Sequence, residues 1–263
     1  MTWLASLPAG LLVSGSLAFA LLVAAASRTT IRALVPDPER DHVQAIAAPL
    51  MPALGAAFAV LMALTLASEA AYLRSAQDIV STEAAEASRL AWTATGQGAA
   101  TAPIQGALGE YLRATRASEW RGGGSSERAD PRTARALANL QRVVRTEAAR
   151  TALGTPTSTE LLASLDALTM ERRDRLAAAS HKLPVLYIVT LIASGVALIV
   201  NAGALTFRSS VRPSLLVAGL AVVVALSLAL LFALSAPWDG ALIVSGQPID
   251  SVLRDLEAGF FRT

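Results

Sequence analysis

The stretch TSTELLASLDALTMERRDRLAAASHKLPVLYIVTLIASGVALIVNAGALTF, residues 157–207, changes character at Pro184. Before the proline, apolar residues recur at helical spacing among many charges. After it, Val185–Phe207 contains no charged residue. About 20 apolar residues cross the hydrocarbon layer of a bilayer as a helix. The stretch therefore predicts a helix outside a membrane followed directly by a helix inside it.

The whole chain is rich in long apolar windows. Of its 263 residues, 54% are hydrophobic, the mean hydropathy is +0.50, and soluble proteins have about 45–50% apolar residues. Four windows of 22 or 23 residues carry no charge: Leu4–Ala26, Ile46–Ala67, Val185–Phe207 and Ser214–Ala236. A large soluble helical core is the alternative, but soluble helices are rarely apolar on every side. We predict an all-α protein with a four-helix transmembrane bundle and an extramembrane helical bundle inserted between spans 2 and 3.

This architecture divides the chain into four segments. They are 1–67 with spans 1 and 2 and a short basic loop, 68–183 as the extramembrane helical domain, 184–236 with spans 3 and 4, and 237–263 as a C-terminal interfacial segment. No basic residue precedes Arg28, so a retained first span is favoured over a cleaved signal peptide, although Ala24–Ala26 resembles a cleavage site. The chain has no cysteine, which excludes disulfides and thiolate chemistry.

The segment 68–183 has the pattern of four amphipathic helices. The first continues the second span as far as Trp92, and the second fits Pro103–Glu119. Asp130-Pro131 is typical of the N-cap and first residue of the third helix. Thr157–Glu160 has the spacing of a capping box and marks the start of the fourth.

The fourth helix places two arginines on its apolar stripe. Six positions fall within about 80° of arc at about 100° per residue: Leu161, Leu165, Leu168, Arg172, Arg175 and Ala179. A buried arginine needs a carboxylate partner. Equal rise along antiparallel helices predicts that Arg172 pairs with Glu83 and that Lys182 lies near Glu69. The alternative is that Arg172 and Arg175 face water or lipid headgroups.

The third span has a small polar stripe. Thr190, Ser194 and Asn201 lie within about 40° of one another on a helix. They could line a pore, but hydrogen bonding between helices is the favoured interpretation. None of the four charge-free windows contains an ionisable residue, which argues against a proton-coupled or ion-coupled carrier and leaves a passive pore possible.

The distribution of basic residues predicts the orientation of the chain in the membrane. The two short loops hold five arginines: Arg28, Arg32, Arg40, Arg208 and Arg212. The positive-inside rule then predicts cytoplasmic short loops, with both termini and the helical domain outside the cytoplasm.

Trp238, Asp239 and Gly240 are expected to form a turn at the membrane interface. Pro248–Ala258 fits a short amphipathic helix that docks on the domain or lies along the membrane.

Short motifs recur in order over nearly the whole chain. They are Leu34-Val35-Pro36, Glu83-Ala84, Tyr111, Glu119-Trp120, Arg172-x-x-Arg175-Leu176, Pro184 and Pro237-Trp238-Asp239-Gly240. In these motifs the chain resembles an uncharacterised bacterial family of bestrophin-like integral membrane proteins. The resemblance implies two spans, a helical domain and two further spans. The family's name suggests an anion channel. For a multi-pass protein of a bacterial family we expect the cytoplasmic (inner) membrane as its location.

No set of residues indicates an enzyme, and no metal or cofactor is predicted. His42 and His181 fall on opposite predicted sides of the membrane, so they cannot share a metal ion. Two hypotheses remain. The first is an oligomeric passive channel, with Arg172, Arg173 and Arg175 making its mouth positive. The second is a non-enzymatic sensor or scaffold whose domain 68–183 binds a protein partner. The expected partners are therefore the lipid bilayer, further copies of the chain and, on the second hypothesis, a protein that binds through 68–183, but no nucleic acid.

Overall fold

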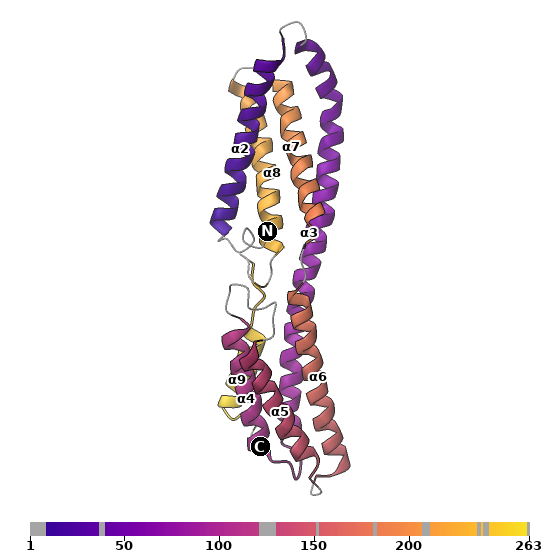
Figure 1. Ribbon diagram of the computed structural model, residues 1–263, viewed down its shortest axis with the longest axis vertical. Helices are drawn as coiled ribbons and strands as arrows, with labels where there is room; N and C mark the ends of the chain where they lie inside the picture. The colour runs from indigo at the N-terminus through magenta and orange to yellow at the C-terminus, as the bar shows by residue number, and fades with distance from the viewer. Residues whose placement is uncertain are drawn as a thin grey trace. The chain divides into compact units, whose positions relative to one another are not determined.

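Figure 1 shows the computed structural model, which describes residues 9–36, 40–120, 130–150, 153–180, 183–206, 211–235, 238 and 242–261. Within these ranges the regular structure consists of eight helices and no strand. Four helical stretches are long and apolar enough to cross a membrane: Gly10–Leu34, His42–Thr93, Val185–Thr206 and Leu215–Leu234. The predicted all-α fold class with four spans is confirmed.

The chain forms two compact units. The membrane unit consists of Met1–Tyr72 and Lys182–Leu242, and the extramembrane unit of Leu73–His181 and Ile243–Thr263. Helix α3, Arg40–Thr93, contributes residues to both. Its 54 residues give a length of about 80 Å at 1.5 Å per residue, whereas a hydrocarbon layer is about 30 Å thick. Most of α3 therefore lies beyond the part needed to span a membrane.

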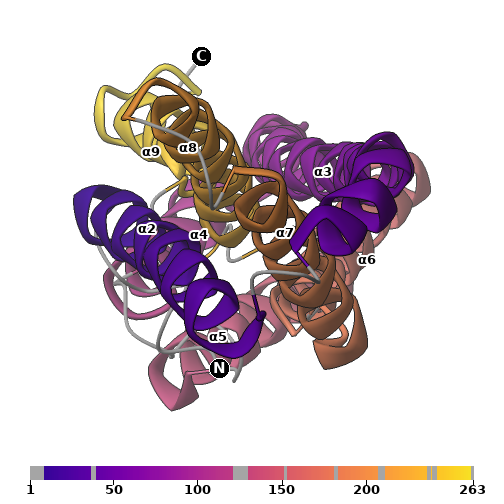
Figure 2. The ribbon, with the colours of Figure 1, turned by 90° about the horizontal axis from the view of Figure 1, so that it is seen from above.

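The membrane unit is built from α2 (Ala9–Leu34), the first part of α3, α7 (Val185–Thr206) and α8 (Val211–Leu234). Helices α2, α7 and α8 lie side by side in both views (Figures 1 and 2). The apolar core of the unit includes Phe58, Met62, Leu191, Leu198, Val224 and Leu231. Gly195 lets α3, α7 and α8 meet, because a Cβ there would come 2.9 Å from Val224 Cγ1 and 3.3 Å from Phe58 Cε2.

The extramembrane unit contains the rest of α3 with α4 (Thr101–Ser118), α5 (Pro131–Ala148), α6 (Thr155–Ala179) and α9 (Gln247–Glu257). All six residues of the predicted α6 stripe are buried. Helix α9 docks on α4 in this unit, where Asp250 accepts two hydrogen bonds from Arg116 at 2.5 and 2.8 Å. Phe261 lies edge-on to Trp92, with the ring centroids 5.2 Å apart. The C-terminal segment thus packs on the extramembrane unit.

The helix ends show where local signals decide the structure. Asp130 caps α5 as expected, since its carboxylate accepts a hydrogen bond of 2.7 Å from the Arg132 backbone N–H. The capping-box prediction at Thr157–Glu160 is wrong: α6 already begins at Thr155, with Gly154 as its N-cap and a proline in its first turn. That proline suits the first turn because its missing N–H is not needed there. The predicted start of the first span at Leu4 lies outside the described residues.

Candidate functional site

Four charged side chains form a buried cluster inside the extramembrane unit. Glu83 comes from α3, Glu119 caps the C-terminal end of α4, and Arg172 and Arg175 come from α6. Arg175 Nε donates to Glu83 Oε2 at 2.5 Å, and Arg175 Nη2 donates to Glu119 Oε2 at 2.6 Å. Arg172 Nη2 donates to Glu119 Oε1 at 2.6 Å. None of these side chains is more than 7% exposed. The cluster therefore ties three helices together away from water.

Two aromatic residues extend the cluster. The Tyr111 hydroxyl donates to Glu83 Oε1 at 2.6 Å. The guanidinium carbon of Arg175 lies 5.0 Å from the centroid of the Trp120 ring, a cation–π distance. Trp120 Nε1 also donates to the Val244 carbonyl at 3.2 Å. Through Trp120 the charged cluster is connected to the segment that leads into α9.

The charges in the cluster balance, two carboxylates against two guanidinium groups. Burial is the largest single influence on the pKa of Arg175 and lowers it, but the charge and hydrogen bond of Glu83, together with Tyr111 and Glu119, outweigh burial, so this pKa lies above the ordinary arginine value. Burial and the nearby Glu83 carboxylate together raise the pKa of Tyr111 well above its usual value. Arg175 is therefore charged and Tyr111 neutral at physiological pH. The arrangement fits a structural clamp.

The structure corrects the predicted pairing of Arg172 with Glu83. Glu83 pairs with Arg175, which lies about one helical turn after Arg172 on α6, and Arg172 pairs with Glu119. The prediction assumed that α3 and α6 are level at the membrane, and a displacement of one turn changes the partner. Glu119 was missed as a partner, although it lies seven residues after the buried Leu112 and so on the same face of its helix.

The burial of this cluster also bears on the hypothesis of a positive channel mouth. Arg172 and Arg175 are neutralised by carboxylates and are inaccessible to ions in solution. Of the three arginines proposed for the mouth, only Arg173 is exposed. The idea that Arg172 and Arg175 make a vestibule positive is therefore wrong.

The raised pKa of Tyr111 predicts how the free energy of unfolding depends on pH. Its pKa is raised in the folded state and is about 10 in an unfolded chain. Above about pH 10 the unfolded state binds fewer protons, so the free energy of unfolding falls as pH rises, whereas below that pH the contribution of Tyr111 is complete. We expect Tyr111→Phe to be less stable at pH 8 by about 1.5–3 kcal/mol, the value of a hydrogen bond to a charged group. Its stability should fall less than that of the parent between pH 9 and 11 in denaturant titrations; equal losses would contradict this account.

The three residues of the predicted polar stripe on α7 differ in burial and in hydrogen-bond partner. Asn201 is buried, and its Nδ2 donates to the Ala47 carbonyl of α3 at 3.0 Å. Two prolines lie within the continuous helix α3 near this contact, at 49 and 52, and each lacks a backbone donor. Thr190 is exposed, and its hydroxyl donates to its own helix at the Leu186 carbonyl, 2.8 Å away. Ser194 is partly buried and donates to the Leu191 carbonyl in the same way at 3.1 Å. Asn201 thus joins two helices, and Thr190 faces outward.

A family model described as a bestrophin-like domain matches residues 18–249. The chain belongs to the bestrophin-like family. This confirms the resemblance seen in the sequence motifs. The match begins inside α2, ends inside α9 and includes all four residues of the charged cluster. No curated protein and no solved structure matches the chain. Together with the four apolar helices, the family indicates a membrane protein.

One further motif of this bestrophin-like protein follows the fourth span. Trp238 Nε1 donates to the Tyr72 hydroxyl at 3.4 Å, which connects the end of the α8 segment to α3 within the membrane unit. The other two residues of the predicted interface turn, Asp239 and Gly240, lie outside the described residues, as do His181 and Lys182. The predicted proximity of Lys182 to Glu69 remains a prediction.

Proposed function

We propose that this bestrophin-like protein is an oligomeric, passive channel that prefers anions, and that it has no enzymatic activity. The observation that carries the proposal is the match of the bestrophin-like domain over residues 18–249. The charge-free windows of the four spans support it, because a passive pore can be lined by small polar or apolar side chains, whereas coupled carriers use ionisable ones.

A pathway for ions is expected between copies of the chain. The interior of one membrane unit is filled by side chains such as Phe58, Met62 and Leu198. Outside this core, α7 presents Thr190 and Ala193 at helical spacing, and both are exposed. We infer that this surface of α7 lines the pore when several copies assemble. The short basic loops would face the cytoplasm of a bacterial cell, and the extramembrane unit would lie outside it.

Ion flux from liposomes tests this function. The purified protein is reconstituted, and efflux is measured separately under a chloride gradient and a potassium gradient. We expect chloride flux to exceed potassium flux and to be absent from protein-free liposomes. Asn201→Leu is the matched variant: it should lower stability, because the bond to Ala47 is lost, but leave ion selectivity unchanged. No flux from a folded oligomer would contradict the proposal and favour a scaffold that binds a partner. Equal flux of both ions would contradict the anion preference.

A further inference from the structure

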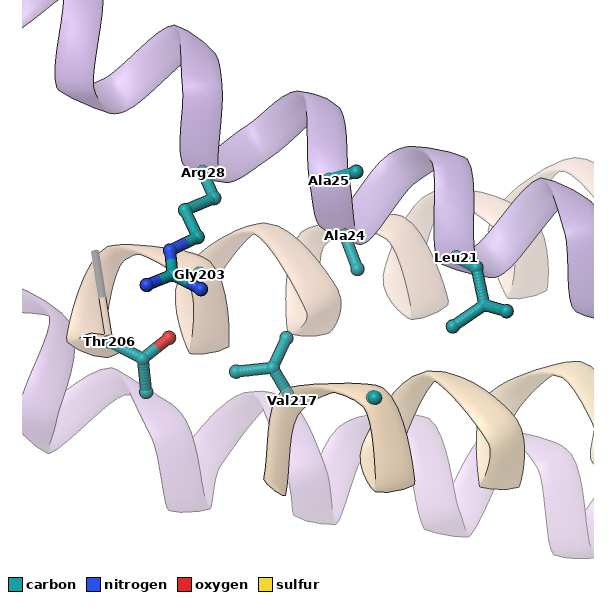
Figure 3. A pocket seen from close by; sticks show the side chains of 8 residues that line it. Leu21, Ala24, Ala25, Arg28, Gly203, Thr206 and Val217 are labelled. Atoms are coloured by element: carbon teal, nitrogen blue, oxygen red, sulfur yellow. The ribbon is translucent and has the colours of Figure 1, made fainter. Parts of the chain in front are cut away.

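The membrane unit contains a pocket between α2, α7 and α8 (Figure 3). Its volume is about 190 Å³, and its lining includes Leu21, Ala24, Arg28, Gly203, Thr206 and Val217. Figure 3 shows the Arg28 side chain reaching from α2 toward Gly203 and Thr206 of α7. Arg28 and Thr206 are the polar members of this lining, and the others are apolar.

Small residues explain why the pocket exists. At Gly203 the helices α2 and α7 are in contact, because a Cβ there would come 2.5 Å from Ser27 Oγ. Next to this contact the pocket is walled by alanines, Ala24 and Ala25 on α2 and Ala218 on α8, which leave space that larger side chains would fill. The close approach of α2 and α7 thus leaves a pocket that α8 closes on a third side.

The lining is complementary to an amphiphile with a negatively charged head, because a basic side chain lies beside an apolar wall. Arg28 lies at one end, and the apolar wall continues along α2 to Leu21, about 10 Å away at 1.5 Å per residue. The volume equals that of about six water molecules at about 30 Å³ each. The pocket can therefore hold a phosphate-sized group and a short length of hydrocarbon, but not a whole lipid. Outside it, α2 exposes Leu22, which is 69% accessible, so the remaining chain can lie in the bilayer.

We propose that this pocket binds the anionic headgroup region of one phospholipid, with Arg28 on the phosphate and the first acyl carbons against Leu21 and the alanines. Basic pockets between transmembrane helices bind anionic headgroups in this way. The proposal requires a membrane but does not depend on channel activity.

Mass spectrometry of the intact protein with its bound lipids tests the site. The full chain in a neutral detergent is titrated with phosphatidylglycerol and with phosphatidylcholine of the same acyl chains. We expect phosphatidylglycerol to bind about tenfold more tightly, because the choline cation of phosphatidylcholine offsets the phosphate charge that attracts Arg28. Arg28→Gln should abolish this preference. Arg32→Gln, one turn further along α2 and not part of the lining, should retain it.

Further variants and a soluble competitor complete the test. Arg28→Lys keeps the charge and should retain the preference, so it separates loss of binding from loss of folding. Ala218→Leu keeps Arg28 but fills the apolar part, and should weaken both lipids. A preference that survives Arg28→Gln, or is lost equally in Arg32→Gln, overturns the proposal. So does displacement of the lipid by equimolar inorganic phosphate, which would identify a site for free phosphate.

Discussion

Replacing Arg175 by methionine is expected to lower the free energy of unfolding of the extramembrane unit by about 3–5 kcal/mol. Arg175 is 2% exposed and bonds both Glu83 and Glu119. Methionine fills similar space but leaves two buried carboxylates with only Arg172 to balance them. The contact with the Trp120 ring is lost as well. Urea unfolding in detergent, followed by tryptophan fluorescence, measures the change.

Arg173→Met is the matched control for this experiment. Arg173 lies on the same helix but is exposed, so its replacement should change stability by less than about 0.5 kcal/mol. If Arg175→Met were no more destabilising than Arg173→Met, the buried cluster would not be the clamp that holds α3, α4 and α6 together.

The second large effect is expected in the membrane unit, from Gly195→Leu. A single Cβ at this position would already lie 2.9 Å from Val224 and 3.3 Å from Phe58. A leucine must separate α7 from α3 or α8, and overpacking of this kind costs about 1–3 kcal/mol, occasionally more. We expect a lower thermal unfolding midpoint in detergent and a broadened or aggregated peak in size-exclusion chromatography.

Gly219→Leu on α8 provides the comparison. A Cβ at Gly219 meets nothing within 4 Å, so leucine there adds apolar surface without a clash. Its unfolding midpoint should stay close to that of the parent protein. Equal destabilisation by the two substitutions would mean that the close packing at Gly195 does not hold the helices together.

The spans and the amphipathic stripes could be predicted because burial and lipid exposure leave periodic patterns. The six stripe positions on α6, from Leu161 to Ala179, are all buried, as their spacing predicts. Helix ends were harder to predict. Helix α2 continues to Leu34, beyond Ala26, where the predicted span ends, because polar residues at the end of a span can remain helical in the interfacial region.

The partners within the site could not be read from the same patterns. Periodicity gives the face of a residue but not its height against another helix, so Glu83 was assigned to Arg172 and not to Arg175. Two residues on the same face of a helix can also be covered by different helices, or by none. Asn201 and Thr190 share a stripe, but Asn201 bonds α3 and Thr190 is exposed. The Arg28 pocket depends on how α2 packs against α7 and α8, which come much later in the chain, and no local pattern encodes it.

The central claim, an anion pore lined by α7, is tested most directly by a cysteine at Thr190. The chain has no native cysteine, so Thr190→Cys is the sole thiol, and Thr65→Cys on α3 serves as control. Each of these threonine hydroxyls donates to a carbonyl of its own helix. Current across a planar bilayer is recorded while negatively and positively charged thiol reagents are added. We expect the negative reagent to block Thr190→Cys faster than the positive one, with no block of Thr65→Cys. A Thr190→Cys protein that is labelled but conducts unchanged would contradict the account.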